Sequence, residues 1–170
     1  QSTGQVLVCL MTTSGQRDTI ASLASNLIAR QPHLVGFYWG VTNALADIAQ
    51  PEELSLMAGA PYLEDRLGPF TLQLHPLSFI QPSSRQADRL YRELVDSVAE
   101  QGGATAWDLY CGVGVIGLYL AKRFTRVYGI DSEPHHIELA ARNAAANHIS
   151  NMTFVAGRAE QLLRDRRAWL

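Results

Sequence analysis

The feature that most constrains the fold of this chain is a glycine loop set between a strand pattern and a helix pattern. Gly112 and Gly114 follow the apolar stretch 105–109, and Asp131 ends the next apolar stretch at about the 20-residue spacing of nucleotide-binding units. Glycines allow a sharp turn and close approach of a ligand, and a carboxylate can accept hydrogen bonds from both hydroxyls of a ribose. The pattern predicts a nucleotide-type pocket. The alternatives are a glycine-rich turn without a ligand and an Asp131 that only caps the following helix.

Strand and helix patterns alternate on both sides of this loop. Strands are expected at Thr105–Leu109, Arg126–Ile130 and Met152–Val155, and helices at Val115–Phe124, Pro134–Asn147 and Glu160–Trp169. Such alternation indicates an α/β fold with a doubly wound parallel sheet. Sheets of this kind usually have five or more strands. Residues 104–170 are therefore expected to form a truncated, Rossmann-like sheet.

The residues before position 104 have a different pattern of expected elements. Residues 1–76 are expected to form a small α+β portion, with strands at Gln5–Met11, Leu34–Trp39, Leu54–Met57 and Pro69–Leu74 and a helix at Arg17–Arg30. Residues 77–103 are expected to be a connector and a helix. Ser83, three residues before Gln86, has the spacing of a capping box, and Gly102 with Gly103 would end that helix.

Composition limits the classes of protein that the chain can belong to. An apolar fraction of 47% and a charged fraction of 18% over 170 residues are typical of a globular protein with a core. No run of about 18 apolar residues predicts a membrane span, and the first residues lack the layout of a signal peptide. Cys9 and Cys111 lie far apart, each in an apolar segment, and are expected to be small buried residues. Two such thiols favour a reducing compartment, so we expect a cytoplasmic protein.

The net charge and the positions of the histidines limit which partners and metals we expect. The formal net charge of −2 argues mildly against a chain that binds nucleic acid by itself through phosphate contacts. His135 and His136 are neighbours on an expected helix and point in different directions, so no metal site is expected.

Asp108 helps to decide which cofactor the glycine loop binds. This carboxylate lies four residues before Gly112 and would repel the pyrophosphate of a dinucleotide. It would attract the ammonium and sulfonium groups of S-adenosyl-L-methionine (SAM). The spacing therefore favours SAM over NAD. Tyr110, at the edge of the loop, could lie against the ligand or belong to the core.

Several stretches together resemble the RNA 5-methyluridine (uracil-5-) methyltransferases, which methylate carbon 5 of uracil in tRNA and ribosomal RNA. Residues 108–121 read Asp-Leu-Tyr-Cys-Gly-Val-Gly-Val-Ile-Gly-Leu-Tyr-Leu-Ala, and residues 141–147 read Ala-Arg-Asn-Ala-Ala-Ala-Asn. Residues 78–81, Ser-Phe-Ile-Gln, are similar to a Ser-Phe-Phe-Gln stretch of that family. Two separated motifs in the family's order are more specific than a glycine loop alone.

This resemblance implies a set of roles. Gln81 would reach between the cofactor and the uracil, and Tyr110 would border the cofactor. The loop at Gly112 and Gly114 would lie beside the methionine part of SAM, and Asp131 would bind its ribose. Residues 1–76 would belong to an RNA-facing surface. The partner of the full-length enzyme would be tRNA or rRNA.

The family's chemistry implies that the chain is a central fragment. In that family a cysteine thiolate attacks carbon 6 of uracil and a base later removes the proton from carbon 5. By the resemblance both groups lie beyond residue 170, so no catalytic residue is expected within this chain and the fragment itself is expected to be inactive. An incomplete sheet would leave an edge open to self-association.

Two positions depart from the family pattern, and other functions stay open. Ser83 stands where the family usually has Asn, and Arg158 cannot accept a hydrogen bond from the adenine amino group. Alternatives to the RNA methyltransferase are a SAM methyltransferase of another substrate class, an NAD-binding oxidoreductase domain and a non-catalytic interaction module.

Overall fold

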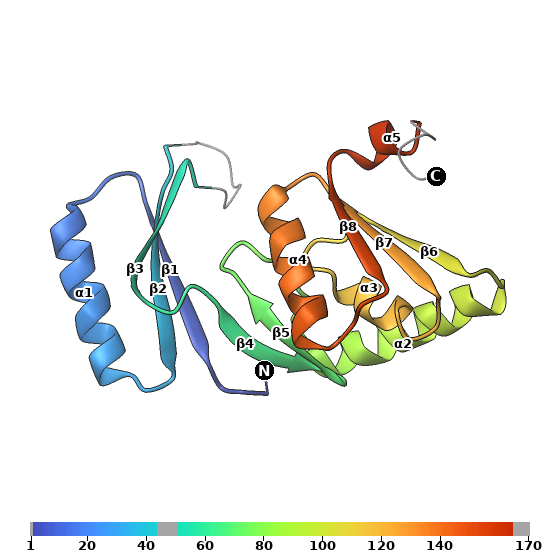
Figure 1. Ribbon diagram of the computed structural model, residues 1–170. Helices are drawn as coiled ribbons and strands as arrows, with labels where there is room; N and C mark the ends of the chain where they lie inside the picture. Colours follow the sequence, from blue (N-terminus) through green and yellow to red (C-terminus); the bar gives the residue numbers. More distant parts are fainter. Residues whose placement is uncertain (1, 44–50, 165–170) are drawn as a thin grey trace. The chain divides into compact units, whose positions relative to one another are not determined.

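A computed structural model describes residues 2–43 and 51–164 of the chain (Figure 1). Its contacts divide the chain into two compact units. The first consists of Gln1–Asp65 with Leu74–Leu77, and the second of Arg66–Gln73 with Ser78–Leu170. Residues 66–73, which the sequence grouped with the first portion, are thus assigned to the second unit.

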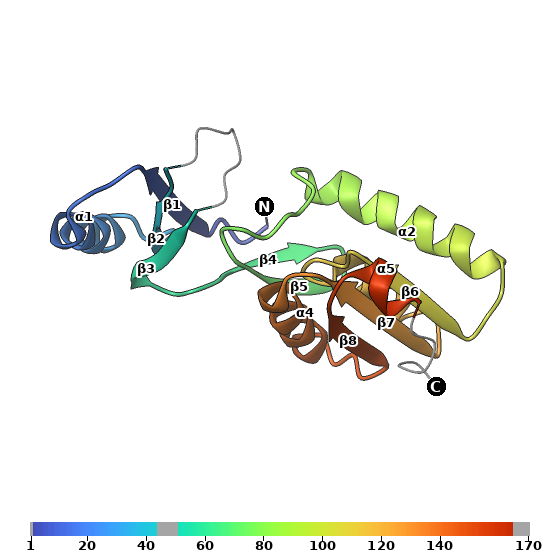
Figure 2. The same cartoon turned by 90° about the horizontal axis from the view of Figure 1, so that it is seen from above.

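The first unit is a small three-stranded sheet with one helix. Its strands β1 (Val6–Thr12), β2 (Leu34–Val41) and β3 (Glu53–Gly59) lie in that order, with β1 parallel and β3 antiparallel to β2. Helix α1 (Arg17–Arg30) joins β1 to β2 (Figure 2). It buries Ala24. The central strand β2 is buried along most of its length, including Phe37 and Trp39. The predicted helix and strands are all present, with strand ends shifted by one or two residues.

A hairpin follows, and one of its strands was not predicted. Strand β4 (Leu63–Leu67) pairs with β5 (Phe70–Leu74) in a two-stranded sheet. Three charged residues stand between the two leucines of β4, which hides the apolar signal of a strand. Asp65 is nevertheless buried, because its carboxylate accepts hydrogen bonds from the backbone N–H and the hydroxyl of Ser2. Such a long-range partner cannot be read from local sequence.

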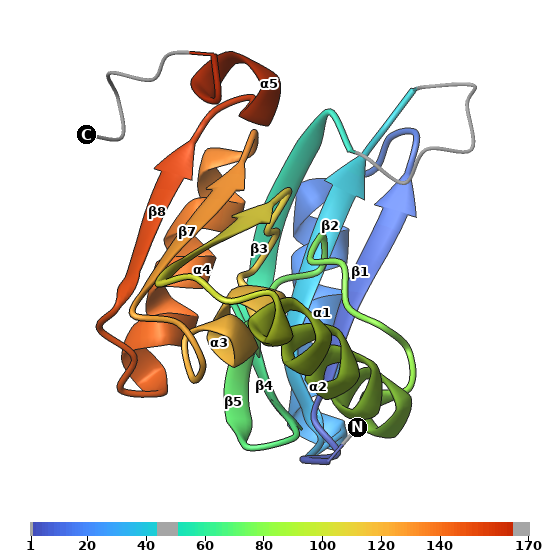
Figure 3. The same cartoon turned by 90° about the vertical axis from the view of Figure 1, so that its right-hand side faces the viewer.

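The second unit has the predicted alternation of strands and helices. Its elements are α2 (Ser84–Glu100), β6 (Thr105–Leu109), α3 (Val115–Leu120), β7 (Arg126–Asp131), α4 (Pro134–Ala146), β8 (Met152–Ala156) and α5 (Ala159–Leu162). Strands β6, β7 and β8 are all parallel and lie in sequence order (Figure 3). Right-handed connections between neighbouring parallel strands place α3 and α4 on one face of this sheet. The structure confirms the α/β fold class, with a Rossmann-like parallel sheet after a small α+β portion.

The helix signals in the sequence act as predicted at α2. The hydroxyl of Ser83 accepts a hydrogen bond from the Gln86 N–H at the start of the helix. Gly102 and Gly103 both adopt positive φ after its end, where a residue with a β-carbon would be strained.

Two helices end earlier than the sequence suggested. Helix α3 ends at Leu120, and beyond it Asn151 donates hydrogen bonds to the carbonyls of Ala121 and Phe124. Helix α5 was expected over residues 160–169. It covers Ala159–Leu162, and residues 165–170 lie outside the described residues.

Two asparagines, Asn143 on α4 and Asn147 at its C-cap, bind the edge of β5 as another strand would. Asn143 accepts a hydrogen bond from the Gln73 N–H at 2.7 Å and donates to the Gln73 carbonyl at 3.3 Å. One turn later, Asn147 accepts from the Thr71 N–H at 2.9 Å and donates to the Thr71 carbonyl at 2.7 Å. Asn143 also donates to the carbonyl of Val113 in the glycine loop. The loop, α4 and β5 are thereby joined through one buried side chain.

Two classes of feature are absent from the part of the chain that the structure describes. None of its helices is both long enough and apolar enough to cross a membrane. None of its groups of histidine, cysteine, aspartate or glutamate side chains could hold a metal ion.

Candidate functional site

The glycine loop leaves β6 at its carboxyl end, the edge where open α/β sheets bind ligands. Gly112 has φ +52° and Gly114 has φ +82°, both in the left-handed region. A β-carbon on Gly112 would meet no atom within 4 Å, whereas one on Gly114 would lie 3.0 Å from the β-carbon of Ala140 on α4. Gly114 is therefore needed for packing the loop against α4. Gly112 faces open space that a ligand can enter.

Asp108 is buried and holds the start of α3. Its Oδ2 accepts a hydrogen bond of 2.7 Å from the Gly117 N–H. Burial raises the pKa of Asp108 to about 6, while the Gly117 hydrogen bond lowers it and the nearby Asp131 raises it. Besides accepting the hydrogen bond from Gly117, the Asp108 carboxylate can attract a cationic ligand. The ligand role of Asp108 remains a prediction.

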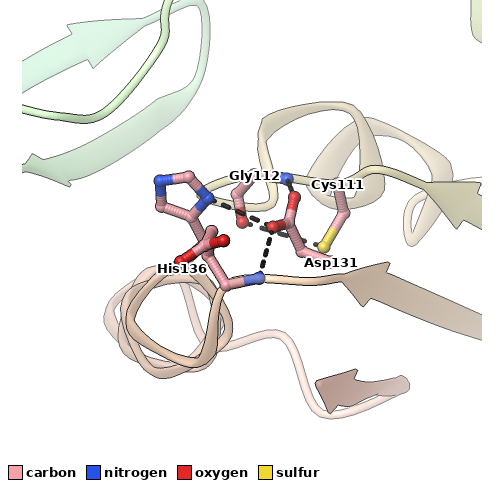
Figure 4. Close-up of polar contacts among 5 residues, drawn as sticks. Cys111, Gly112, Asp131 and His136 are labelled. Atoms are coloured by element: carbon pink, nitrogen blue, oxygen red, sulfur yellow. Dashed lines mark hydrogen bonds and ion pairs between the residues drawn. The ribbon is translucent and has the colours of Figure 1, made fainter. Parts of the chain in front are cut away.

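Asp131 stands at the end of β7, beside the glycine loop (Figure 4). Its Oδ2 accepts a hydrogen bond of 2.8 Å from the Gly112 N–H. Its Oδ1 accepts one of 3.0 Å from the Glu133 N–H and lies 3.2 Å from Nδ1 of His136. Asp131 therefore binds the backbone of Glu133, the N-cap residue of α4, without being the cap itself, and also holds the loop at Gly112. These two predicted site residues are in direct contact.

Tyr110 follows β6, and its side chain links the glycine loop to α5. It has φ +62°, which is uncommon for a residue with a β-carbon, and its side chain is exposed. Its hydroxyl donates a hydrogen bond of 2.7 Å to Glu160 on α5, after β8. Of the two uses considered for Tyr110, the structure excludes the core. Arg158, which precedes α5, is exposed, and its Nε lies 3.9 Å from Glu160.

Gln81 lies in a different hollow, at the start of α2. Six residues line this hollow of about 400 Å³, namely Gln81, Pro82, Ser83, Gln86, Ala87 and Leu90. The described contacts bring Asp131 and Gly112 together and place Asp108, Tyr110 and Gly114 on the same loop. They do not bring Gln81 into that group.

Cys111 is buried inside the loop and has the properties of a structural thiol. Burial, followed by the charges of Asp108 and Asp131, raises its pKa above the usual range. The thiolate is the nucleophilic form of cysteine, so Cys111 is not suited to attack a substrate. Cys9 is partly buried in β1, and burial likewise raises its pKa.

The arrangement is suited to the nucleoside part of a ligand. A carboxylate beside an open glycine backbone, at the carboxyl ends of β6 and β7, can accept hydrogen bonds from ribose hydroxyls. The residues present therefore fit an adenosine-containing cofactor such as SAM.

The sequence interpretation missed two residues of this region. His136 was considered only as a metal ligand, and its position three residues after Glu133, the residue that caps α4, could have suggested a side chain reaching back toward Asp131. Asn143 was part of the family motif, but nothing local in the sequence points to its partner on β5.

Residues 100–167 match the family model described as a methyltransferase domain. An RNA methyltransferase of Clostridium tetani, described as uncharacterized, is 35% identical over 169 residues, which is 97% of this chain and 37% of that protein. A similar protein of Clostridium acetobutylicum is 29% identical over 167 residues, again 97% of this chain and 37% of that protein. The chain thus spans a little over a third of the length of these relatives.

Solved structures show the same fold. The crystal structure of a Pyrococcus abyssi tRNA (uracil-54, C5)-methyltransferase in complex with S-adenosyl-L-homocysteine is 31% identical, with a TM-score of 0.65 over 90% of this chain and 36% of that chain. A tRNA m1G37 methyltransferase of Methanocaldococcus jannaschii is 17% identical, with a TM-score of 0.52 over 92% of this chain and 45% of that chain, and so shows the fold alone. The second unit has the fold of a Rossmann-like SAM methyltransferase.

Proposed function

We propose that this chain is part of a SAM-dependent RNA methyltransferase and that the loop at Gly112 with Asp131 binds SAM. The observation that carries the proposal is the contact between Asp131 and the Gly112 N–H beside open space. The match to a methyltransferase domain and the relatives named RNA methyltransferases support it.

In this proposal each loop residue has a separate task. Asp131 accepts hydrogen bonds from the ribose hydroxyls, and Gly112 leaves room for the ligand next to the backbone. Asp108 keeps α3 in place and contributes negative charge near the cationic methionine part. Tyr110 borders the ligand from the exposed side of the loop. When bound, SAM would supply a methyl group on a sulfonium, an electrophile that an activated base can attack.

We further propose that the methyl acceptor is carbon 5 of a uridine in tRNA or rRNA. The resemblance of residues 78–81 and 108–121 to the uracil-5 methyltransferases supports this, as does the 31% identity to a tRNA uracil-54 methyltransferase. Neither Cys111 nor Cys9 is suited to be the nucleophile. The proposal therefore assigns the attacking thiolate and the base to parts of the protein outside these 170 residues.

Calorimetric titration of the chain with SAM tests the cofactor assignment. We expect saturable binding of SAM, no binding of NAD, and weaker binding of SAM by Asp131→Ala. Exposed Asp18 on α1, in the other unit, provides a matched control, because Asp18→Ala leaves the loop intact. Failure of a folded chain to bind SAM, or binding of NAD instead, would contradict the assignment.

The substrate assignment requires the full-length protein. RNA transcripts incubated with labelled SAM and then digested to nucleosides are expected to contain 5-methyluridine. Label in a guanosine or in another position of the uridine would contradict the uracil-5 assignment and leave the SAM assignment standing.

A further inference from the structure

Among the described residues, His136 is the one side chain that hydrogen-bonds Asp131, and the other donors are the backbone N–H groups of Gly112 and Glu133 (Figure 4). An ionised carboxylate only accepts hydrogen bonds, so the tautomer of His136 that matches this contact has its proton on Nδ1. A carboxylate has about four acceptor positions on its two oxygens. From the described part of the chain, two donors share Oδ1 and one uses Oδ2, so these contacts leave one acceptor position on Oδ2.

A ribose needs more than one acceptor position on Asp131. Its two neighbouring hydroxyls bind a carboxylate as a pair, one on each oxygen, and Oδ1 already has both of its positions filled. One of the protein donors must leave before both hydroxyls can bind.

Only His136 can leave without disturbing the backbone. The Gly112 N–H belongs to a loop that is held by the hydrogen bond from Cys111 N–H to the Ile130 carbonyl. Glu133 caps α4, and its carbonyl accepts hydrogen bonds from the backbone N–H groups of His136 and Ile137. The His136 side chain is 23% exposed, so its ring has solvent to rotate into.

We infer that His136 is a positioning residue that holds Asp131 in the absence of ligand and rotates away when a ribose diol binds. This inference rests on the proposed binding of SAM at Asp131. Breaking the His136 contact is a cost of binding, so His136 sets the affinity of the site for diol-containing ligands.

The test is a calorimetric titration of the 170-residue chain with S-adenosylhomocysteine and with its 2′,3′-dideoxy analogue. His136→Ala is expected to bind S-adenosylhomocysteine about three- to tenfold more tightly than the wild type, the range that corresponds to one hydrogen bond. This gain is expected to be smaller for the dideoxy analogue, which does not need the acceptor position. Exposed His148, after α4, has φ +56°, and His148→Asn is the matched control because Asn tolerates this conformation.

A spectroscopic measurement follows the ring itself. Adding S-adenosylhomocysteine to the wild type is expected to shift the ring nitrogen resonances of His136 and to leave those of His148 in place. A static structural histidine would show no such change.

The outcomes separate this inference from the proposed function. Equal or weaker binding of S-adenosylhomocysteine by His136→Ala, with binding by the wild type, would overturn the role of His136 alone. Absence of binding by both folded proteins would overturn the SAM assignment and this inference with it. Binding by the variant and not by the wild type would support the inference.

Discussion

Asn143 and Gln73 form a reciprocal pair of hydrogen bonds, in which the side-chain amide of one residue satisfies both backbone groups of the other. The same amide also donates to the Val113 carbonyl, 3.0 Å away in the glycine loop. Because Asn143 is fully buried, no water can replace these partners when the amide is removed. The position of the glycine loop thus depends on β5, which precedes it by about forty residues.

Asn143→Ala is expected to destabilise the second unit by about 2–4 kcal/mol, because it leaves buried backbone groups without partners. Urea denaturation followed by far-ultraviolet circular dichroism measures this change. Asn26→Ala, on the exposed face of α1, is the control and is expected to change stability by less than about 0.5 kcal/mol. Hydrogen exchange gives a sharper test. Asn143→Ala should speed exchange of the Gln73 amide more than that of Thr71, and Asn147→Ala should do the reverse.

Asp108 makes stability depend on pH. Its folded-state pKa of about 6 lies above its ordinary value of 3.8, so folding favours the protonated form. The contribution of this group is fully present below about pH 4 and is lost as pH rises through 6. One pKa unit corresponds to about 1.4 kcal/mol, so the loss is on the order of 2–3 kcal/mol.

Asp108→Asn removes this titration and keeps an oxygen for the Gly117 N–H. The stability of the wild type relative to the variant is therefore expected to fall between pH 4 and pH 7. Parallel urea titrations at several pH values provide the comparison. A difference that stays constant with pH would show that burial does not raise this pKa.

Gly112 and Gly114 are expected to respond differently to the same substitution. Gly112→Ala places a methyl group in open space at φ +52°, so it should cost about 1 kcal/mol of stability and weaken S-adenosylhomocysteine binding. Gly114→Ala adds a contact of 3.0 Å with Ala140 to similar backbone strain and should cost more stability. Denaturation and calorimetry of both variants check these effects. Unchanged affinity in Gly112→Ala would mean that the ligand does not use the open side of the loop.

Cys111 is expected to be unreactive in the folded chain, because burial and two nearby carboxylates disfavour its thiolate. Alkylation by iodoacetamide at pH 8 should be slower by a factor of about 100 or more than in the urea-unfolded chain. Mass spectrometry of the peptides reports Cys111 and Cys9 separately. Cys111→Ala should keep S-adenosylhomocysteine affinity within about threefold. Rapid labelling of native Cys111 would contradict its role as a structural residue.

Sequence alone determined the elements whose signals are local. The cap at Ser83, the glycine stop after α2 and the strand–loop–helix–strand order around Gly112 depend on neighbouring residues, and all of them are present in the structure. The proximity of Asp131 to the glycine loop could also be predicted from sequence, because the carboxyl ends of adjacent parallel strands lie at the same edge of a sheet.

Tertiary structure alone decided the features that depend on distant partners. Strand β4 forms around a buried Asp65 whose partner is Ser2, and Asn143 and Asn147 bind a strand about seventy residues earlier in the chain. Polar side chains carry no local periodic signal of this kind. Their roles follow from which backbone groups the fold leaves unpaired beside them.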